Sequence, residues 1–135
     1  MTFSGINYLA VLVAAVAAFF FGFAYYSTFG EHWRKAAGLP KKRKNPSYTP
    51  LVITFIAELI MAWVLAGLLG HLGPGQVTVR NGIESAAFVW LGFVATTISV
   101  NYAFGGRKPM LTVIDAAHWL LVLAIMGAII GAFGV

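Results

Sequence analysis

Four long apolar runs separated by polar stretches dominate the pattern of this chain of 135 residues. No charged side chain occurs in residues 1–30, 85–106 or 116–135, and Glu58 is the only one in residues 51–70. A helix needs about 20 apolar residues to cross the hydrocarbon core of a bilayer. The pattern therefore predicts four transmembrane helices, near residues 4–27, 50–70, 83–104 and 110–133.

The predicted fold class is an all-α integral membrane four-helix bundle, with residues 1–135 forming a single transmembrane domain. Composition agrees, because hydrophobic residues make up 60% of the chain and charged residues only 10%. A soluble domain of this size needs far more charge to cover its surface. The first run lacks a basic leading segment and is longer than the 7–15 residues or so of a signal-peptide core, so we expect a spanning helix there.

The basic residues are distributed unevenly between the predicted helices. Six of the nine Lys and Arg residues lie between the first and second helices, two between the third and fourth, and only Arg80 between the second and third. The positive-inside rule then places both termini on the non-cytoplasmic side. This distribution argues against nucleic-acid binding. The basic run is a topology signal in a solvated loop or a contact for anionic lipid head groups. It comprises Lys41, Lys42, Arg43 and Lys44.

Residues that start helices lie at the predicted boundaries. Thr49 precedes Pro50, which suits the first position of a helix because its missing N–H costs nothing there. Asn81 and Glu84 have the spacing of a capping box. Pro109 is placed to start the fourth helix.

Small residues recur at helical spacing on the first and fourth predicted helices. In lipid, such faces favour close helix–helix packing through van der Waals contact. The partner is another helix of the bundle or a helix of another chain, and the sequence leaves this open. The residues are Ala14, Ala18 and Gly22 on the first helix, and Gly127 and Gly131 on the fourth.

Under this topology, all four helices carry polar groups in the cytoplasmic half of the bilayer. Ionisable groups inside a membrane span cost roughly 2.5–3.5 kcal/mol on insertion scales, and they usually face the bundle interior, pair, or mark an ion path. We therefore predict an intramembrane polar cluster. Its candidate members are Glu58, Asp115, His118, Asn101, Thr97 and Ser27.

Each ionisable member of this cluster also has a purely structural interpretation. Glu58 either stabilises helix packing through hydrogen bonds or binds a proton or a ligand. Asp115 forms a second capping-box spacing with Thr112, and His118 suits a packing histidine bonded to Asp115. A divalent metal held by all three ionisable groups lacks a fixed-spacing motif to support it. We therefore expect no metal and no cofactor.

The start of the chain resembles a known bacterial family of small four-helix membrane proteins, catalogued as domain of unknown function 1761. The resemblance rests on Asn7, Gly22, Tyr25-Tyr26-Ser27, Phe29-Gly30 and Trp33. Thr28 departs from the family pattern, in which a proline is common. "GIESAAFVWLGF", with Trp90, Gly92 and Phe93, is similar to the family's third helix. The resemblance implies a bacterial inner-membrane protein and brings no activity with it.

Two functional classes fit these observations. The first is a non-enzymatic accessory or scaffold subunit that packs against another membrane protein. The second is a homo-oligomeric transporter or channel for protons, cations or small solutes, with Glu58 as the proton- or cation-handling group. No nucleophile–base arrangement or phosphate-binding glycine loop favours an enzyme.

Overall fold

A computed structural model describes residues 5–40 and 46–134, and its regular structure is entirely helical over those ranges. Four spans are long and apolar enough to cross a membrane, which agrees with the predicted all-α class. The third span is made of α3, a π-helix (η1) and α4 in direct succession. The elements are α1 (Tyr8–Ala37), α2 (Thr49–Gly70), α3 (Val79–Val89), η1 (Trp90–Ala95), α4 (Thr96–Phe104) and α5 (Pro109–Phe133).

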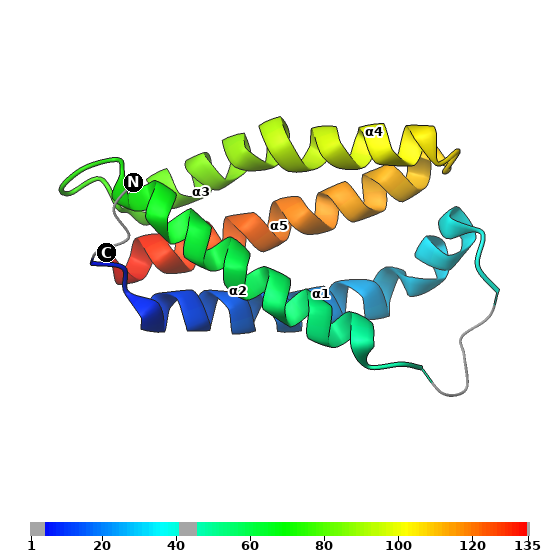
Figure 1. The fold of residues 1–135 in the computed structure, drawn as a ribbon, viewed down its shortest axis with the longest axis horizontal. Helices are drawn as coiled ribbons and strands as arrows, with labels where there is room; N and C mark the ends of the chain where they lie inside the picture. The colour runs from blue at the N-terminus through cyan, green and yellow to red at the C-terminus, as the bar shows by residue number, and fades with distance from the viewer. Residues whose placement is uncertain (1–4, 41–45, 135) are drawn as a thin grey trace.

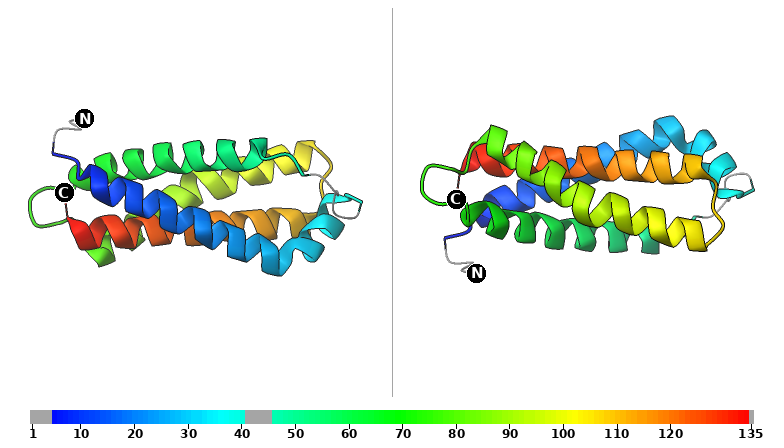
Figure 2. Two further views of the ribbon diagram at one scale, coloured as in Figure 1. Left: turned by 90° about the horizontal axis from the view of Figure 1, so that it is seen from below. Right: turned by 90° about the horizontal axis from the view of Figure 1, so that it is seen from above.

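Helix α5 is the centre of the bundle. It packs most extensively against α3 and α1, whereas α2 packs mainly against α1. Figure 1 shows α5 between α1 and the third span, with the N- and C-terminal ends and the α2–α3 connection at one end of the bundle. The α4–α5 turn lies at the opposite end, and the perpendicular views show the long, narrow outline of the bundle (Figure 2).

Helix α1 extends well beyond the apolar run that predicted it. It continues from the expected end near residue 27 to Ala37, and its last turn carries Arg34 and Lys35. Gly38 ends the helix in the left-handed conformation at φ 68°, which glycine adopts without steric cost. Hydropathy marks only the part of a helix suited to lipid, so it could not detect this polar extension.

The predicted caps of the second and third spans need correction. The Thr78 hydroxyl accepts from the Asn81 backbone N–H, so Thr78 caps α3 in place of Asn81. Glu84 pairs with Arg80 at 2.8 Å instead of closing a capping box. Helix α2 begins at Thr49, so the capping position falls on Tyr48, whose side chain makes no capping hydrogen bond.

Glycines allow α3 and α5 to approach until their backbones touch. A Cβ on Gly127 would overlap the Gly82 carbonyl, and a Cβ on Gly131 would overlap the Thr78 carbonyl. The GxxxG spacing on α5 therefore packs within the chain. Ala14 and Ala18 are fully buried on α1 and belong to the hydrophobic core.

Candidate functional site

Asp115 on α5 receives three hydrogen bonds from two other helices. Its Oδ1 accepts from the Tyr26 hydroxyl at 2.6 Å and from the Trp33 indole N–H at 3.0 Å. Its Oδ2 accepts from the Tyr102 hydroxyl at 2.6 Å. Because Tyr26 and Trp33 lie on α1 and Tyr102 lies on α4, the carboxyl joins three helices. We call these four residues the Asp115 lock.

Two further side chains donate to the α5 backbone beside this lock. The Tyr25 hydroxyl bonds the Ile114 carbonyl at 2.7 Å, and the Trp90 indole bonds the Ala116 carbonyl at 2.7 Å. Trp90 is the first residue of η1, where the i→i+5 bonding pattern widens the helix. Three consecutive residues of α5 are thus held from α1, η1 and α4, which fixes the third span against the bundle.

His118 lies one turn further along α5, inside a cage of aromatic rings. Its ring stacks on Phe21 at 6.3 Å and meets Tyr25, Tyr26 and Trp119 at 4.7–5.4 Å between centroids. Only 3% of the residue is exposed, and the structure gives Nδ1 no hydrogen-bond partner among the described residues. No hydrogen bond between His118 and Asp115 is formed within the described structure, so the expected pairing is not seen.

Gly22 explains how the histidine fits against α1. A Cβ at this position would come within 2.9 Å of the His118 Nε2 atom. The glycine predicted from the small-residue pattern therefore makes room for an imidazole, in addition to allowing α1 and α5 to approach each other.

Glu58 is completely buried on α2, and both of its carboxyl oxygens lack a hydrogen-bond partner among the described residues. It shares its face with the buried Ala62 and Ala66. No described residue of α2 nearer the Thr49 end is buried, so Glu58 is the first buried side chain along α2. A buried polar group without a partner costs about 1–3 kcal/mol.

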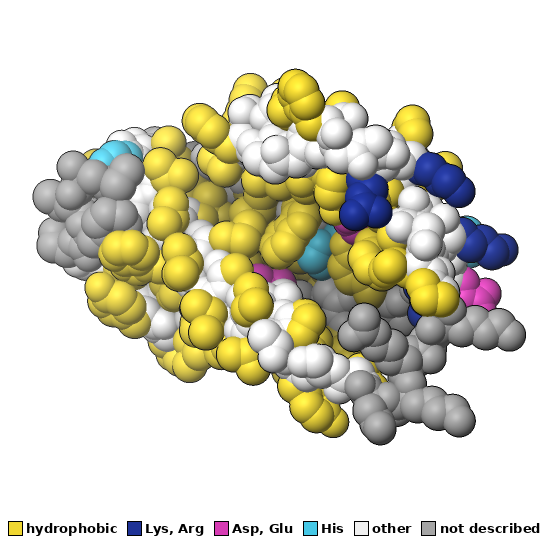
Figure 3. Space-filling view, turned by 45° about the vertical axis from the view of Figure 1, so that its right-hand side comes forward, with side chains coloured by type: hydrophobic (Ala, Val, Ile, Leu, Met, Phe, Trp, Pro, Cys, Tyr) yellow, Lys and Arg dark blue, Asp and Glu magenta, His cyan; other side chains and the backbone are white. Residues whose placement is uncertain are grey.

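The other three predicted cluster members lie elsewhere. Ser27, Thr97 and Asn101 are exposed on the surface of α1 and α4, and the Thr97 hydroxyl bonds its own helix at the Phe93 carbonyl. The structure therefore does not gather all six candidates. Figure 3 shows a hollow between the helices in which histidine and acidic side chains lie among hydrophobic ones.

The predictions about metal binding and lipid head groups can be compared with the structure only where it describes the chain. Among the described residues, no group of three or more His, Asp or Glu side chains is placed to hold a metal ion. Lys41, Lys42, Arg43 and Lys44, predicted to contact lipid head groups, fall outside the described residues.

Sequence reasoning identified Asp115 but missed its partners. Trp33 and Tyr26 lie 82 and 89 residues away in the chain, so no local spacing connects them to the carboxyl. One signal was present: tyrosines at positions 26 and 102 each lie at the expected cytoplasmic end of a span, the end where Asp115 also lies.

These features define a class: a small all-α protein of four apolar, membrane-length helices, with a layer of buried polar groups near one end. The chain belongs to the DUF1761 family, described as a protein of unknown function, whose model matches residues 9–131. The family resemblance inferred from the sequence is therefore confirmed. No curated protein and no solved structure shows a significant match to the chain.

Proposed function

We propose that this protein is a non-enzymatic accessory or scaffold subunit that packs its third span against another membrane protein. The supporting observation is the exposure of that span. Only 6% of its apolar stretch is buried, compared with 50% for α5 and 28% for each of the first two spans. Phe88 and Phe93 on this span are 76% and 73% exposed.

The exposed surface of the third span carries a stripe of small and hydroxyl residues, in addition to large apolar ones. Side chains of this kind let helix backbones approach closely in lipid. A Cβ added at Gly92 would contact no described atom within 4 Å, so the space beside it is open. We call this stripe the small-residue face; it consists of Gly92, Thr96, Ser99 and Ala103.

The Asp115 lock supports the same function, because it fixes the helix that presents this face. Tyr102 is on α4 together with Ser99 and Ala103, and its bond to Asp115 ties α4 to the central helix. A partner would then meet a helix held in one orientation, which lowers the entropic cost of association. Association occurs in a bacterial inner membrane, with the lock near the cytoplasmic surface and both termini on the other side, as the basic residues favour.

Purification in a mild detergent tests this function. We expect wild-type protein to elute in a complex larger than one chain. Gly92→Leu should release it as a folded single chain, because the added side chain meets nothing inside the bundle. Ala24→Leu, an exposed small-to-large change on α1, is the matched control and should leave the complex intact. Elution of the wild type as a single chain would contradict the proposal.

A second candidate function is a homo-oligomeric transporter or channel for protons, cations or small solutes. The observation that favours it is that two buried groups, the Glu58 carboxyl and His118 Nδ1, have no hydrogen-bond partner in the part of the chain that the structure describes. Ionisable groups kept inside a membrane protein are often part of an ion or proton path. In this interpretation Glu58 binds the proton or cation at the first buried turn of α2.

Flux measurements in proteoliposomes test this second candidate. Glu58→Gln should abolish flux driven by a pH gradient, because the amide cannot release a proton. Glu31→Gln, at an exposed position near the end of α1, should leave the flux at the wild-type rate. Equal flux in Glu58→Gln and the wild type would exclude Glu58 from such a mechanism.

A further inference from the structure

A groove runs between α1 and α5 at the end of the bundle that carries the α4–α5 turn. Its volume is about 530 Å³, within the 300–1,000 Å³ or so typical of small-molecule sites. Its walls are mostly apolar: Phe29 and Ala36 line it from α1, and Met110, Val113 and Ala117 line it from α5. Met110 and Val113 are 58% and 60% exposed, so the groove is open along its side.

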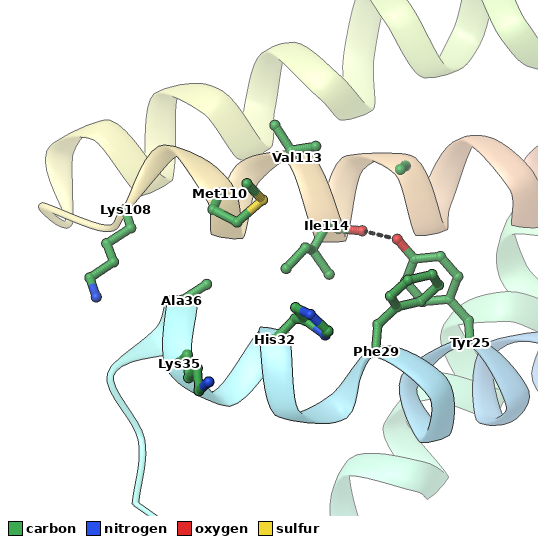
Figure 4. Close-up of a pocket in the computed structure, with 10 residues that line it drawn as sticks. Tyr25, Phe29, His32, Lys35, Ala36, Lys108, Met110, Val113 and Ile114 are labelled. Carbon is green, nitrogen blue, oxygen red and sulfur yellow. Dashed lines mark hydrogen bonds between the residues drawn. The ribbon is translucent and has the colours of Figure 1, made fainter.

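The two ends of the groove differ in chemistry. At the inner end, the Tyr25 hydroxyl bonds the Ile114 carbonyl at 2.7 Å and joins the two walls. At the outer end, Lys35 comes from α1 and Lys108 from the residue before α5, one on each wall (Figure 4). His32 lines the groove between these ends, and no acidic side chain is among its described lining residues.

The length of the groove suits an elongated ligand. Lys108 and Ala117 are nine positions apart along the α5 end of the chain, which corresponds to roughly 13 Å at the helical rise. A ligand that lies along the groove therefore has its polar end near Lys35 and Lys108 and its apolar part among Phe29, Met110 and Val113. The four apolar spans place this end of the bundle at a membrane surface.

We infer that this groove binds an anionic phospholipid, with the headgroup phosphate between Lys35 and Lys108 and one acyl chain along α5. Charge complementarity selects this occupant, because the lysines favour an anionic headgroup over a zwitterionic one. The apolar walls select a lipid over a free phosphate. Lysine chains also extend readily along apolar surface while the ammonium reaches the headgroup region. This site is separate from the small-residue face, which lies on the third span.

Binding of lipids to delipidated protein in a non-ionic detergent, followed by native mass spectrometry, tests the inference. Phosphatidylglycerol should bind more tightly than phosphatidylcholine with the same acyl chains. The Lys35→Gln/Lys108→Gln double variant should lose about fivefold in affinity for each lysine, roughly twenty-five-fold in total, and lose the headgroup preference. Lys35→Arg/Lys108→Arg should retain both affinity and preference.

A second variant tests the apolar part of the groove. Ala117→Leu fills the space between the walls and should weaken both lipids, whereas Ala132→Leu, at an exposed position near the other end of α5, should weaken neither. Arg80→Gln, at the opposite end of the bundle, is the charge control. Glycerol phosphate, which lacks acyl chains, should fail to compete with phosphatidylglycerol.

Two results would overturn this site. One is unchanged phosphatidylglycerol affinity in the double glutamine variant when its helical content and elution match the wild type. The other is competition by glycerol phosphate at the affinity of the lipid, which would show a phosphate site without an acyl chain. If the glutamine variant misfolds, the lipid affinities of Ala117→Leu and Ala132→Leu decide: equal affinities would overturn the site.

Discussion

The Tyr102 hydroxyl donates a 2.6 Å hydrogen bond to Oδ2 of Asp115, which ties the end of the third span to the central helix. The other carboxyl oxygen, Oδ1, bonds Tyr26 and Trp33 on α1. A buried carboxyl with three donors is well satisfied, whereas removing it would leave those donors without a partner. The polar residues at this position therefore act as a structural joint between helices.

Tyr102→Phe should lower the free energy of unfolding in mixed detergent micelles by about 1–3 kcal/mol, because one hydrogen bond to the buried carboxyl is lost. Tyr48→Phe, at a position that is 76% exposed, should have little effect. In a double-mutant cycle, Tyr102→Phe should cost much less in the Asp115→Ala background than in the wild type. Strict additivity of the two changes would contradict the lock.

Gly82→Ala should destabilise the bundle by about 1–3 kcal/mol, because the new Cβ would overlap the Gly127 carbonyl and separate α3 from α5. Gly92→Ala should be neutral or stabilising by up to about 1 kcal/mol, since that Cβ meets nothing and alanine favours the helix. Unfolding free energies compare the two glycines directly. Equal effects at the two positions would show that α3 and α5 do not touch at Gly82.

Glu58→Met should raise the stability of the isolated protein by about 1–3 kcal/mol, because it replaces a buried group without a described partner by an apolar chain of similar length. Glu31→Met, on the exposed end of α1, should leave the unfolding free energy almost unchanged. A fall in stability for Glu58→Met would reveal a partner for the carboxyl within the folded chain.

The chain contains no cysteine, so single introduced thiols report topology without background. A membrane-impermeant maleimide should label His71→Cys, in the α2–α3 connection, on intact cells. Ser47→Cys, before α2, should be labelled only after the membrane is opened, because eight of the nine Lys and Arg residues lie in the two polar stretches of sequence that link the apolar runs at that end. The reverse pattern would invert the proposed orientation.

The sequence predicted the helices of this protein better than the contacts between them. The four spans were predictable because about 20 apolar residues in succession leave few alternatives. The polar end of α1, which carries Trp33, was not predictable as helix, because charged residues after an apolar run also suit a loop. The π-helical turn Trp90–Ala95 has no local signal in the sequence, because the hydrogen bond that anchors it joins the Trp90 indole to the distant Ala116 carbonyl.

The same difference holds for the candidate site, whose residues were predictable but whose contacts were not. Glu58, Asp115 and His118 were found because ionisable residues are rare in apolar runs, and all three are buried. Their partners depend on how the helices pack, so periodicity could not show that Asp115 accepts three hydrogen bonds whereas Glu58 has no partner among the described residues. For Thr97 and Asn101, a shared depth in the membrane was mistaken for a shared site.

Cross-linking at the small-residue face tests the central claim, that the third span meets another protein. A thiol-directed cross-linker in native membranes should convert Ser99→Cys into a discrete heavier species, whose mass distinguishes a second copy from a different partner. Ile53→Cys is the control, because it is 62% exposed on α2 at a similar distance from the same end of the bundle. A product at Ser99→Cys and none at Ile53→Cys is the predicted result. Equal cross-linking at both positions, or none at either, would contradict the claim.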